Sequence, residues 1–315
     1  MTRPGKILAI TGGVGGAKLA LGLAKVLNPQ QLIFAVNVGD DFEHLGLHIS
    51  PDIDSLTYAL AGENNQELGW GRAGETWQFI DTLGSLGGED WFRLGDKDLA
   101  LHMRRRQLLN DGASLTEATA YITRHMSIAH AVIPISNDPI RTIAHTDQGD
   151  LAFQHYFVRE RCEPAVSGFN FAGMPQARLN PAISTWLEDC DGIIICPSNP
   201  FVSVAPVIEV EGFLQAAANI PTVAVSPIVA GTAIKGPAAK MMRELAMPAS
   251  AVAVAEHYAR RYPGLLNGFV IDESDAADLD RFDLPTVATP SVMRSLDDRI
   301  ALAQRCLSFL GELTN

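Results

Sequence analysis

The chain has 315 residues, of which 47% are hydrophobic and 19% are charged, so it can bury one large core or two modest ones. Its net charge of -12 argues against broad binding to nucleic acid or to an anionic membrane, because both attract basic surfaces. An anionic ligand would therefore have to be held by a local site.

Several features bear on the compartment. The apolar run at residues 7–10 is too short for the core of a signal peptide, and the longest apolar stretch, residues 213–233, is interrupted by Pro221 and Pro227. The four cysteines show neither CxxC nor zinc-ligand spacing, which is typical of reduced core thiols. We therefore expect a cytoplasmic protein without a membrane span.

The first elements predict a right-handed βαβ unit. Residues 7–10 read as a buried strand that ends in glycines, and apolar residues recur at helical spacing from Ala17 to Leu27. Pro29 ends that helix, and residues 32–38 form a second apolar run that closes on Gly39-Asp40-Asp41.

The rest of the chain predicts a mostly parallel sheet with helices on both faces and a mainly helical insertion at about 55–130. Helical patterns cover residues 76–86, 99–109 and 115–125, and buried strands are predicted at residues 131–135, 192–196 and 222–225. Residues 151–158 predict a strand that pairs with residues 142–146 across a turn. Without repeats or an obvious linker, we expect one α/β domain spanning residues 1–315.

The run Gly12-Gly13-Val14-Gly15-Gly16-Ala17-Lys18 lies between the first strand and the first helix. Glycines remove the Cβ atoms and leave N–H groups at a helix N-terminus, where phosphate binds readily. The run is not a Walker A loop and matches GxGxxG imperfectly. A tight turn without a ligand is the alternative.

Four aspartates follow the second strand: Asp40, Asp41, Asp52 and Asp54. Carboxylates held together repel one another unless they share a hard cation, and Mg²⁺ is typically held by one or two carboxylates and substrate phosphates. The alternatives are that these aspartates cap a loop and a helix, or that Asp40 binds a cofactor ribose, as in a dehydrogenase.

Polar loops follow three later strands, where a parallel sheet would place a binding crevice. The candidate ligand contacts in these loops are Ser136, Ser198, Asn199, Ser226 and Lys235. Arg104-Arg105-Arg106 lies on a predicted helix, and one or two of these arginines are candidates to face phosphate, with a solvated basic face as the alternative.

Taken together, the chain resembles the 2-phospho-L-lactate transferase family, which acts in biosynthesis of the deazaflavin coenzyme F420. The segments that carry the resemblance, in chain order, are Gly12-Gly13-Val14-Gly15-Gly16-Ala17-Lys18, Asn37-Val38-Gly39-Asp40-Asp41, Pro51-Asp52-Ile53-Asp54, Trp70-Gly71 with Glu75-Thr76-Trp77, Leu94-Gly95-Asp96-Lys97-Asp98-Leu99-Ala100, Pro197-Ser198-Asn199-Pro200 and Ser226-Pro227-Ile228-Val229-Ala230-Gly231. Asn137 departs from the family's pattern, in which an aspartate stands at this position.

The resemblance implies a Rossmann-like core and a Mg²⁺-dependent transferase. The reaction would move a phosphorylated three-carbon acid from a guanosine diphosphate-linked donor to the ribityl hydroxyl of the deazaflavin Fo, with release of GMP. A homodimer is the implied assembly. The sequence does not fix which acid is carried.

The resemblance also implies roles for particular residues. Asp40 and Asp41, with Asp52 or Asp54, would hold the metal or accept the hydroxyl proton, and the 12–16 turn would approach the substrate phosphates. Ser198, Asn199 and Lys235 would line the nucleotide side, while Trp70, Trp77 or Phe201 would contribute to a slot for the planar deazaflavin.

Two other functions stay open at this point. A non-catalytic regulator that binds nucleotide sugars has the same glycine-rich start and aspartate pair on the same core, but the signatures at Trp70-Gly71 and residues 226–240 favour the transferase. A nicotinamide-dependent oxidoreductase is supported only by Gly13-Val14-Gly15 and by Asp40 near the expected ribose position.

Overall fold

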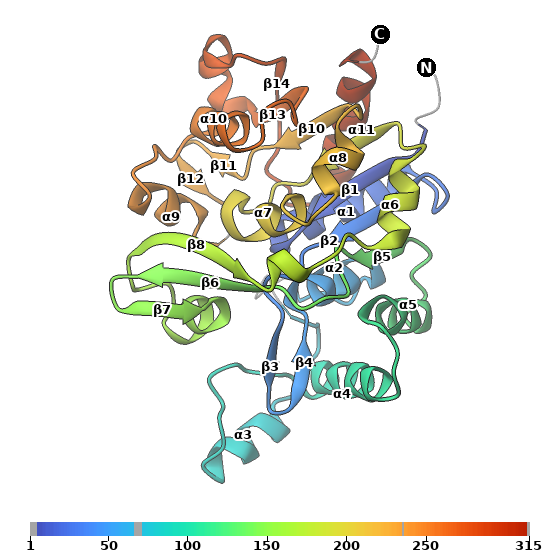
Figure 1. Cartoon of the computed structure of the whole chain (residues 1–315), viewed down its shortest axis with the longest axis vertical. Coiled ribbons are helices and arrows are strands. Elements are labelled where there is room, and N and C mark those ends of the chain that lie inside the picture. The colour runs from blue at the N-terminus through green and yellow to red at the C-terminus, as the bar shows by residue number, and fades with distance from the viewer. Residues whose placement is uncertain (1–4, 66–70, 235, 314–315) are drawn as a thin grey trace.

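The computed structural model describes residues 5–65, 71–234 and 236–313. Its centre is a seven-stranded sheet in which every neighbouring pair of strands is parallel (Figure 1). In spatial order the strands are β14 (Thr286–Thr289), β13 (Gly268–Asp272), β10 (Thr222–Val225), β9 (Gly192–Ile195), β1 (Ile7–Thr11), β2 (Leu32–Val36) and β5 (Ala131–Pro134). The predicted α/β fold with a parallel sheet is confirmed.

The strand order reverses between β1 and β9. From β1 the chain proceeds to β2 and β5 in one direction, whereas from β9 it proceeds to β10, β13 and β14 in the other. Right-handed crossovers therefore place the connecting helices of the two halves on opposite faces. Loops that leave β1 and β9 diverge at such a point and open a crevice beyond the carboxyl ends of the strands.

The helices are α1 (Gly13–Val26), α2 (Pro51–Ala61), α3 (Gln78–Ser85), α4 (Asp96–Asn110), α5 (Leu115–His125), α6 (Pro181–Leu187), α7 (Ala205–Ile208), α8 (Phe213–Ala217), α9 (Ala238–Glu244), α10 (Ala251–Arg261) and α11 (Leu296–Leu313). Helix α1 packs against both α11 and α2. Within the described part of the chain, no helix has the length and apolar character needed to cross a membrane.

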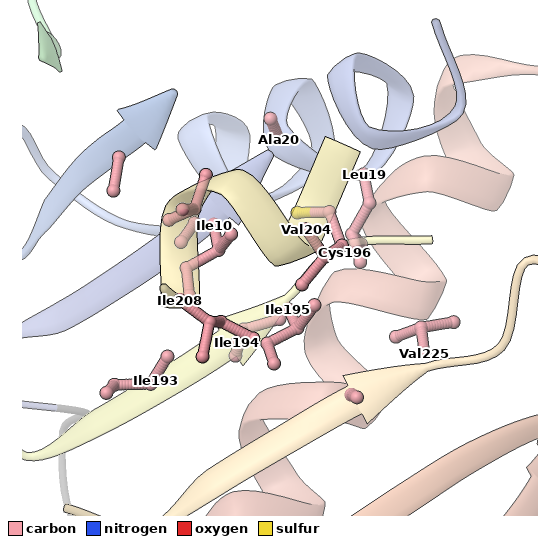
Figure 2. Packing of buried hydrophobic residues seen from close by; sticks show 14 of the residues in the cluster. Ile10, Leu19, Ala20, Ile193, Ile194, Ile195, Cys196, Val204, Ile208 and Val225 are labelled. Carbon is pink, nitrogen blue, oxygen red and sulfur yellow. The ribbon is translucent and has the colours of Figure 1, made fainter. Parts of the chain in front are cut away.

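The core lies between the central strands and these helices. Ile10 of β1 and the Ile193–Ile195 run of β9 are at most 1% exposed, and Leu19 of α1 is fully buried (Figure 2). The apolar runs that predicted these strands are continuous rather than alternating because both faces of a parallel sheet are covered.

The predicted helical insertion is present as α3, α4 and α5, close to the expected ranges. Before it, a hairpin of β3 (Phe42–His44) and β4 (Leu47–Ile49) extends away from the main sheet toward α3 and α4 (Figure 1). This hairpin carries the chain from the end of β2 to the start of α2.

A second, antiparallel sheet has the order β7-β6-β8, with β6 (Arg141–Thr146), β7 (Gly149–Ala152) and β8 (Val166–Ala172). The predicted pairing of residues 142–146 with the following strand is confirmed. The strand ends at Ala152, however, and residues His155–Arg159 form a helical turn. Phe153 and Tyr156 are both buried, and this spacing of three suits a helical turn rather than a strand.

Candidate active site at the carboxyl edge of the sheet

A cavity of ≈ 640 Å³ opens beside the loops that follow the neighbouring strands β1 and β9. The predicted site residues that line it are Gly12, Gly13, Val14, Gly15, Lys18, Asp40, Asp52, Asp54, Ser198, Asn199 and Ser226. The cavity therefore lies in the crevice that the reversal of strand order creates, the usual ligand position in open α/β sheets.

The glycine-rich turn is fitted closely to its neighbours. Gly13 has a φ of +65°, and its N–H donates to Asp52 Oδ1 at 2.6 Å. A Cβ on Gly15 would lie 2.6 Å from the carbonyl oxygen of Pro197, so only glycine permits this approach. The N–H groups of Val14 and Gly15 are the remaining first-turn donors of α1, at the end of the helix that favours an anion.

Asp52 lies in the first turn of α2 and faces the start of α1. It is buried, and its second oxygen accepts a hydrogen bond from Asn37 Nδ2 at 2.8 Å. Burial raises the pKa of Asp52 to about 6, although the hydrogen bonds from Asn37 and Gly13 oppose this rise. A carboxylate with such a pKa is suited to accept a proton near neutral pH.

Asp40 lines the cavity at the end of β2 and is buried, and its Oδ1 has no hydrogen-bond partner. Burial raises the pKa of Asp40 well above its ordinary value, and the charges of Asp52 and Asp41 raise it further. Gln154 Nε2 donates to the Asp40 carbonyl oxygen at 3.3 Å and fixes the loop. The unpartnered oxygen, beside two further carboxylates, favours a bound cation.

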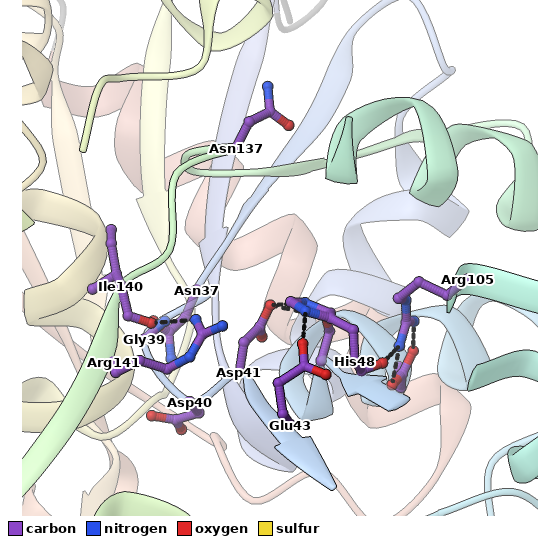
Figure 3. Close-up of polar contacts among 12 residues, drawn as sticks. Asn37, Gly39, Asp40, Asp41, Glu43, His48, Arg105, Asn137, Ile140 and Arg141 are labelled. Atoms are coloured by element: carbon purple, nitrogen blue, oxygen red, sulfur yellow. Dashed lines mark hydrogen bonds and ion pairs between the residues drawn. The ribbon is translucent and has the colours of Figure 1, made fainter. Parts of the chain in front are cut away.

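Asp41 lies beside Asp40 but not among the residues that line the cavity. Its Oδ2 accepts a hydrogen bond from Ser50 Oγ at 2.8 Å and contacts His48 Nε2 at 3.0 Å (Figure 3), whereas its Oδ1 has no partner. The other ring nitrogen of His48 lies 3.3 Å from Glu43 Oε1. Sequence reasoning missed His48, for which proximity to the aspartate cluster was the sole signal.

These two unpartnered carboxylate oxygens fit a hard cation. Among the described residues, no three His, Cys, Asp or Glu side chains are grouped as a complete metal site. Mg²⁺ is commonly held by one or two carboxylates, with waters and substrate phosphates as the other ligands. Asp40 and Asp41 match that donor set.

Asp54 lines the cavity but is engaged in a buried ion pair with Arg105 of α4 (Figure 3). Both of its oxygens accept hydrogen bonds from the guanidinium, one of them at 3.1 Å from Nη1. Its charge is therefore compensated without a metal. None of the three candidate arginines lines the cavity: Arg106 pairs with Glu43, and Arg104 lies over an aromatic ring on α5.

Aromatic side chains form one wall of the cavity, but they are not the ones that the sequence suggested. Trp91 and Phe92 line it from the loop before α4, and Phe153 and Phe157 line it from the segment after β7. Phe153 and Phe157 are stacked with ring centroids 5.6 Å apart. Phe157 is 39% exposed, so its ring can be covered by a ligand.

The suggested aromatics lie elsewhere or cannot be placed. Phe201 is buried beside Phe169, and Trp77 packs under Arg93, and neither Phe201 nor Trp77 lines the cavity. Trp70 and Lys235 lie outside the described residues.

Two other predicted contacts have structural roles. The Ser136 hydroxyl donates to the carbonyl oxygen of Arg178 at 2.6 Å, and Ser136 does not line the cavity. Gly16 is covered by the hydroxyls of Thr11 and Ser198, with which a Cβ would overlap. Ser198 also accepts a hydrogen bond from the N–H of Gly12 at 3.3 Å, so it joins the β9 loop to the glycine turn.

Comparison with known proteins assigns the chain to a family. A model of the family described as 2-phospho-L-lactate transferase CofD matches residues 7–284. The chain is 34% identical over 272 residues to a 2-phospho-L-lactate transferase of Methanosarcina mazei, covering 86% of this chain and 88% of that protein. It is also 34% identical over 318 residues to a phosphoenolpyruvate transferase of Streptomyces avermitilis, covering 98% and 99%.

Among solved structures, a upf0052 family member from Bacillus halodurans has a TM-score of 0.67, with 97% of this chain and 99% of that chain covered. Its sequence identity is 14%, so this likeness concerns the fold alone. The family model includes the glycine turn and the aspartate cluster, and the two transferases are similar to most of the chain, so the chain belongs to the 2-phospho-L-lactate transferase family.

Proposed function

We propose that this protein transfers a phosphorylated three-carbon acid, of the 2-phospholactyl or phosphoenolpyruvyl type, from a guanosine diphosphate-linked donor to the ribityl hydroxyl of the deazaflavin Fo, with release of GMP. The observation that carries the proposal is that one cavity is lined by three kinds of group. These are the N-terminus of α1, the buried carboxylates Asp40 and Asp52, and several aromatic rings.

The acceptor's flat ring system needs an apolar surface of matching shape. Phe157 offers a partly exposed ring already stacked on Phe153, and Trp91 and Phe92 add further apolar area. In this pose the deazaflavin lies against the aromatic wall, and its ribityl chain extends toward the carboxylates. The acceptor hydroxyl then reaches the donor phosphorus.

The proposed cofactor is Mg²⁺, which Asp40 and Asp41 would hold, since each has a carboxylate oxygen without a hydrogen-bond partner. A bound Mg²⁺ would stabilise negative charge on the phosphate oxygens. The proton of the attacking hydroxyl passes to Asp52, a cavity-lining carboxylate whose pKa burial raises to about 6. The new bond joins that hydroxyl oxygen to phosphorus, and the bond from phosphorus to the GMP oxygen breaks.

The leaving nucleotide would lie on the side of the cavity formed by the loops after β9 and β10. Ser198, Asn199 and Ser226 line this side, and the N–H groups of Val14 and Gly15 face the phosphates. Such a site positions the reactants and stabilises charge, and it requires no covalent intermediate on the protein.

The test is a turnover assay with purified protein, Fo and Mg²⁺. Guanosine diphosphates whose β-phosphate is esterified with lactate, enolpyruvate or glycerate are supplied separately, and GMP and the modified deazaflavin are detected by mass spectrometry. We expect both products with at least one donor and none after chelation of Mg²⁺. Absence of GMP with all three donors would contradict the proposal, and the regulator or oxidoreductase alternatives would then be tested by binding of a nucleotide sugar or NAD.

We also propose that the protein is a homodimer located in the cytoplasm. The dimer follows from the family resemblance, and the four free cysteines agree with a reducing compartment. Sedimentation equilibrium of the purified chain tests the assembly, and a mass of one chain at all concentrations would contradict it.

A further inference from the structure

A second cavity, of ≈ 390 Å³, lies on the other side of the first turns of α1 and adjoins the first cavity. The residues that line both cavities are Val14, Lys18, Ser55, Gly71, Ile234, Val292 and Met293. The second cavity is completed by further residues of α1 and α2, by Asn64 and Asn65, by Arg294 just before α11, and by Arg299 near the beginning of that helix.

The charges around the two cavities differ. The larger cavity is lined by four aspartates, whereas the described residues that line the second include Lys18, Arg294 and Arg299 but no acidic residue. In a chain with a net charge of -12, a concavity whose described charged residues are all basic is an unusual local concentration of positive charge. Ser55 and Asn64 add polar groups to the same walls.

The side chain of Arg299 has no bonded partner among the described residues. Arg299 is 7% exposed, and its Nε has no hydrogen-bond partner. The charge of Asp298 acts on Arg299, but the two side chains form no ion pair. The neighbouring Asp298 is directed to the backbone instead, where it accepts hydrogen bonds from the N–H groups of Arg294 and Ser295. Burial lowers the pKa of Arg299 from its ordinary value, although the charge of Asp298 opposes this fall.

Arg105, which is also buried, is an arginine with a structural role and serves as a comparison for Arg299. Arg105 is 1% exposed, but both oxygens of Asp54 accept hydrogen bonds from its guanidinium. Burying a guanidinium without such a partner is costly, and an anion from outside the chain removes that cost. Arg299 borders a cavity large enough to admit one.

We propose that the second cavity binds a phosphate group, carried by a nucleotide or free, and that Arg299 is its buried counter-ion. Because Val14 and Lys18 line both cavities, a nucleotide at the N-terminus of α1 can extend from one into the other. Lys18 and Arg294 add positive charge on either side of the phosphate. The proposed function enters this inference only in the choice of GMP as the nucleotide probe.

The experiment measures binding of GMP and of inorganic phosphate by titration calorimetry, without deazaflavin, donor or Mg²⁺. Wild type is compared with Arg299→Gln, Arg299→Lys and the control Arg305→Gln, which removes an arginine of the same helix that already pairs with Glu312. We expect Arg299→Gln to weaken binding at least about tenfold, Arg299→Lys to retain most of it, and Arg305→Gln to match wild type.

The two probes distinguish the source of the phosphate. Weakening of both GMP and inorganic phosphate, with GMP the tighter ligand, supports a nucleotide site, and weakening of inorganic phosphate alone supports a site for the free anion. Equal affinities of wild type and Arg299→Gln for both probes would overturn the proposal. A Tm of Arg299→Gln at or above that of wild type in phosphate-free buffer would show that Arg299 is not a structural ion pair. A failed turnover assay would leave these binding results unaffected.

Discussion

Replacing Asp52 by Asn should change the pH dependence of stability in a defined window. The folded-state pKa of Asp52 is raised from 3.8 to about 6, mainly by burial, so the charged form destabilises the fold. The stability that the neutral form contributes is fully present below pH 3.8 and is lost as pH rises through about 6. At 1.36 kcal/mol per pH unit, this pKa difference corresponds to about 3 kcal/mol.

The assay is urea unfolding of wild type and Asp52→Asn at several pH values, in a chelator to exclude bound cations. The variant changes hydrogen bonds to Gly13 and Asn37, and this adds an offset that does not vary with pH. The informative quantity is therefore the difference in unfolding free energy between the two proteins. We expect it to shift in favour of Asp52→Asn by about 2 kcal/mol between pH 4 and pH 6.5, and to level off above about pH 7.

A difference that stays constant across this range would refute the reasoning, because it would mean that Asp52 titrates normally in the folded protein. A shift in the opposite direction would mean that the hydrogen bonds from Gly13 and Asn37 outweigh burial. Asp272 offers a matched control, because hydrogen bonds from Ser291 and Ser274 outweigh burial and lower its pKa. For Asp272→Asn, the change with pH should therefore have the opposite sign.

Four further predictions concern the site and its support. Asp40→Asn should abolish turnover and remove any rise in Tm on addition of Mg²⁺, because it neutralises a carboxylate with an unpartnered oxygen; a Mg²⁺-induced rise equal to that of wild type would place the cation elsewhere. Arg105→Met should lower the free energy of unfolding by about 3–5 kcal/mol in a urea titration, since it leaves Asp54 buried and unpaired, and a loss below 1 kcal/mol would contradict this. Phe157→Ala should raise the KM for Fo about tenfold with little change in kcat, as steady-state kinetics would show; an unchanged KM would remove Phe157 from the acceptor site. Gly15→Ala should cost about 1–3 kcal/mol of stability in the same urea assay, because the added Cβ meets the Pro197 carbonyl, and a variant as stable as wild type would show that the turn can shift.

The sequence was informative wherever local pattern decides structure. Continuous apolar runs predicted β1, β9 and β10 because strands covered on both faces have no polar side. The glycine run predicted the turn into α1. Glycine is favoured at position 13 because φ is positive there, and at position 15 because the backbone lies against the carbonyl oxygen of Pro197.

The partners of charged residues could not be predicted in the same way. Nothing near Arg105 in the sequence indicates that α4 packs its guanidinium against Asp54, which lies 51 residues away. For the same reason Trp91 and Phe157 were not identified as cavity residues: Trp91 comes from a loop and Phe157 from the helical turn after β7, and the approach of both segments to the sheet depends on tertiary packing. The family resemblance suggested Phe201 for the deazaflavin slot, but its side chain is buried in the core.

The packing of α11 against α1 has a consequence for synthesis of the chain. Helix α1 and its glycine turn emerge early from the ribosome, whereas α11 spans residues 296–313 and is translated nearly three hundred residues later. The face of α1 that α11 covers, including the contact of Gly22 with the Arg299 backbone, stays open until then. Apolar surface on α1 therefore stays exposed in the nascent chain until α11 has been synthesised. The ligand site can reach its final form only after almost all of the described chain has been made.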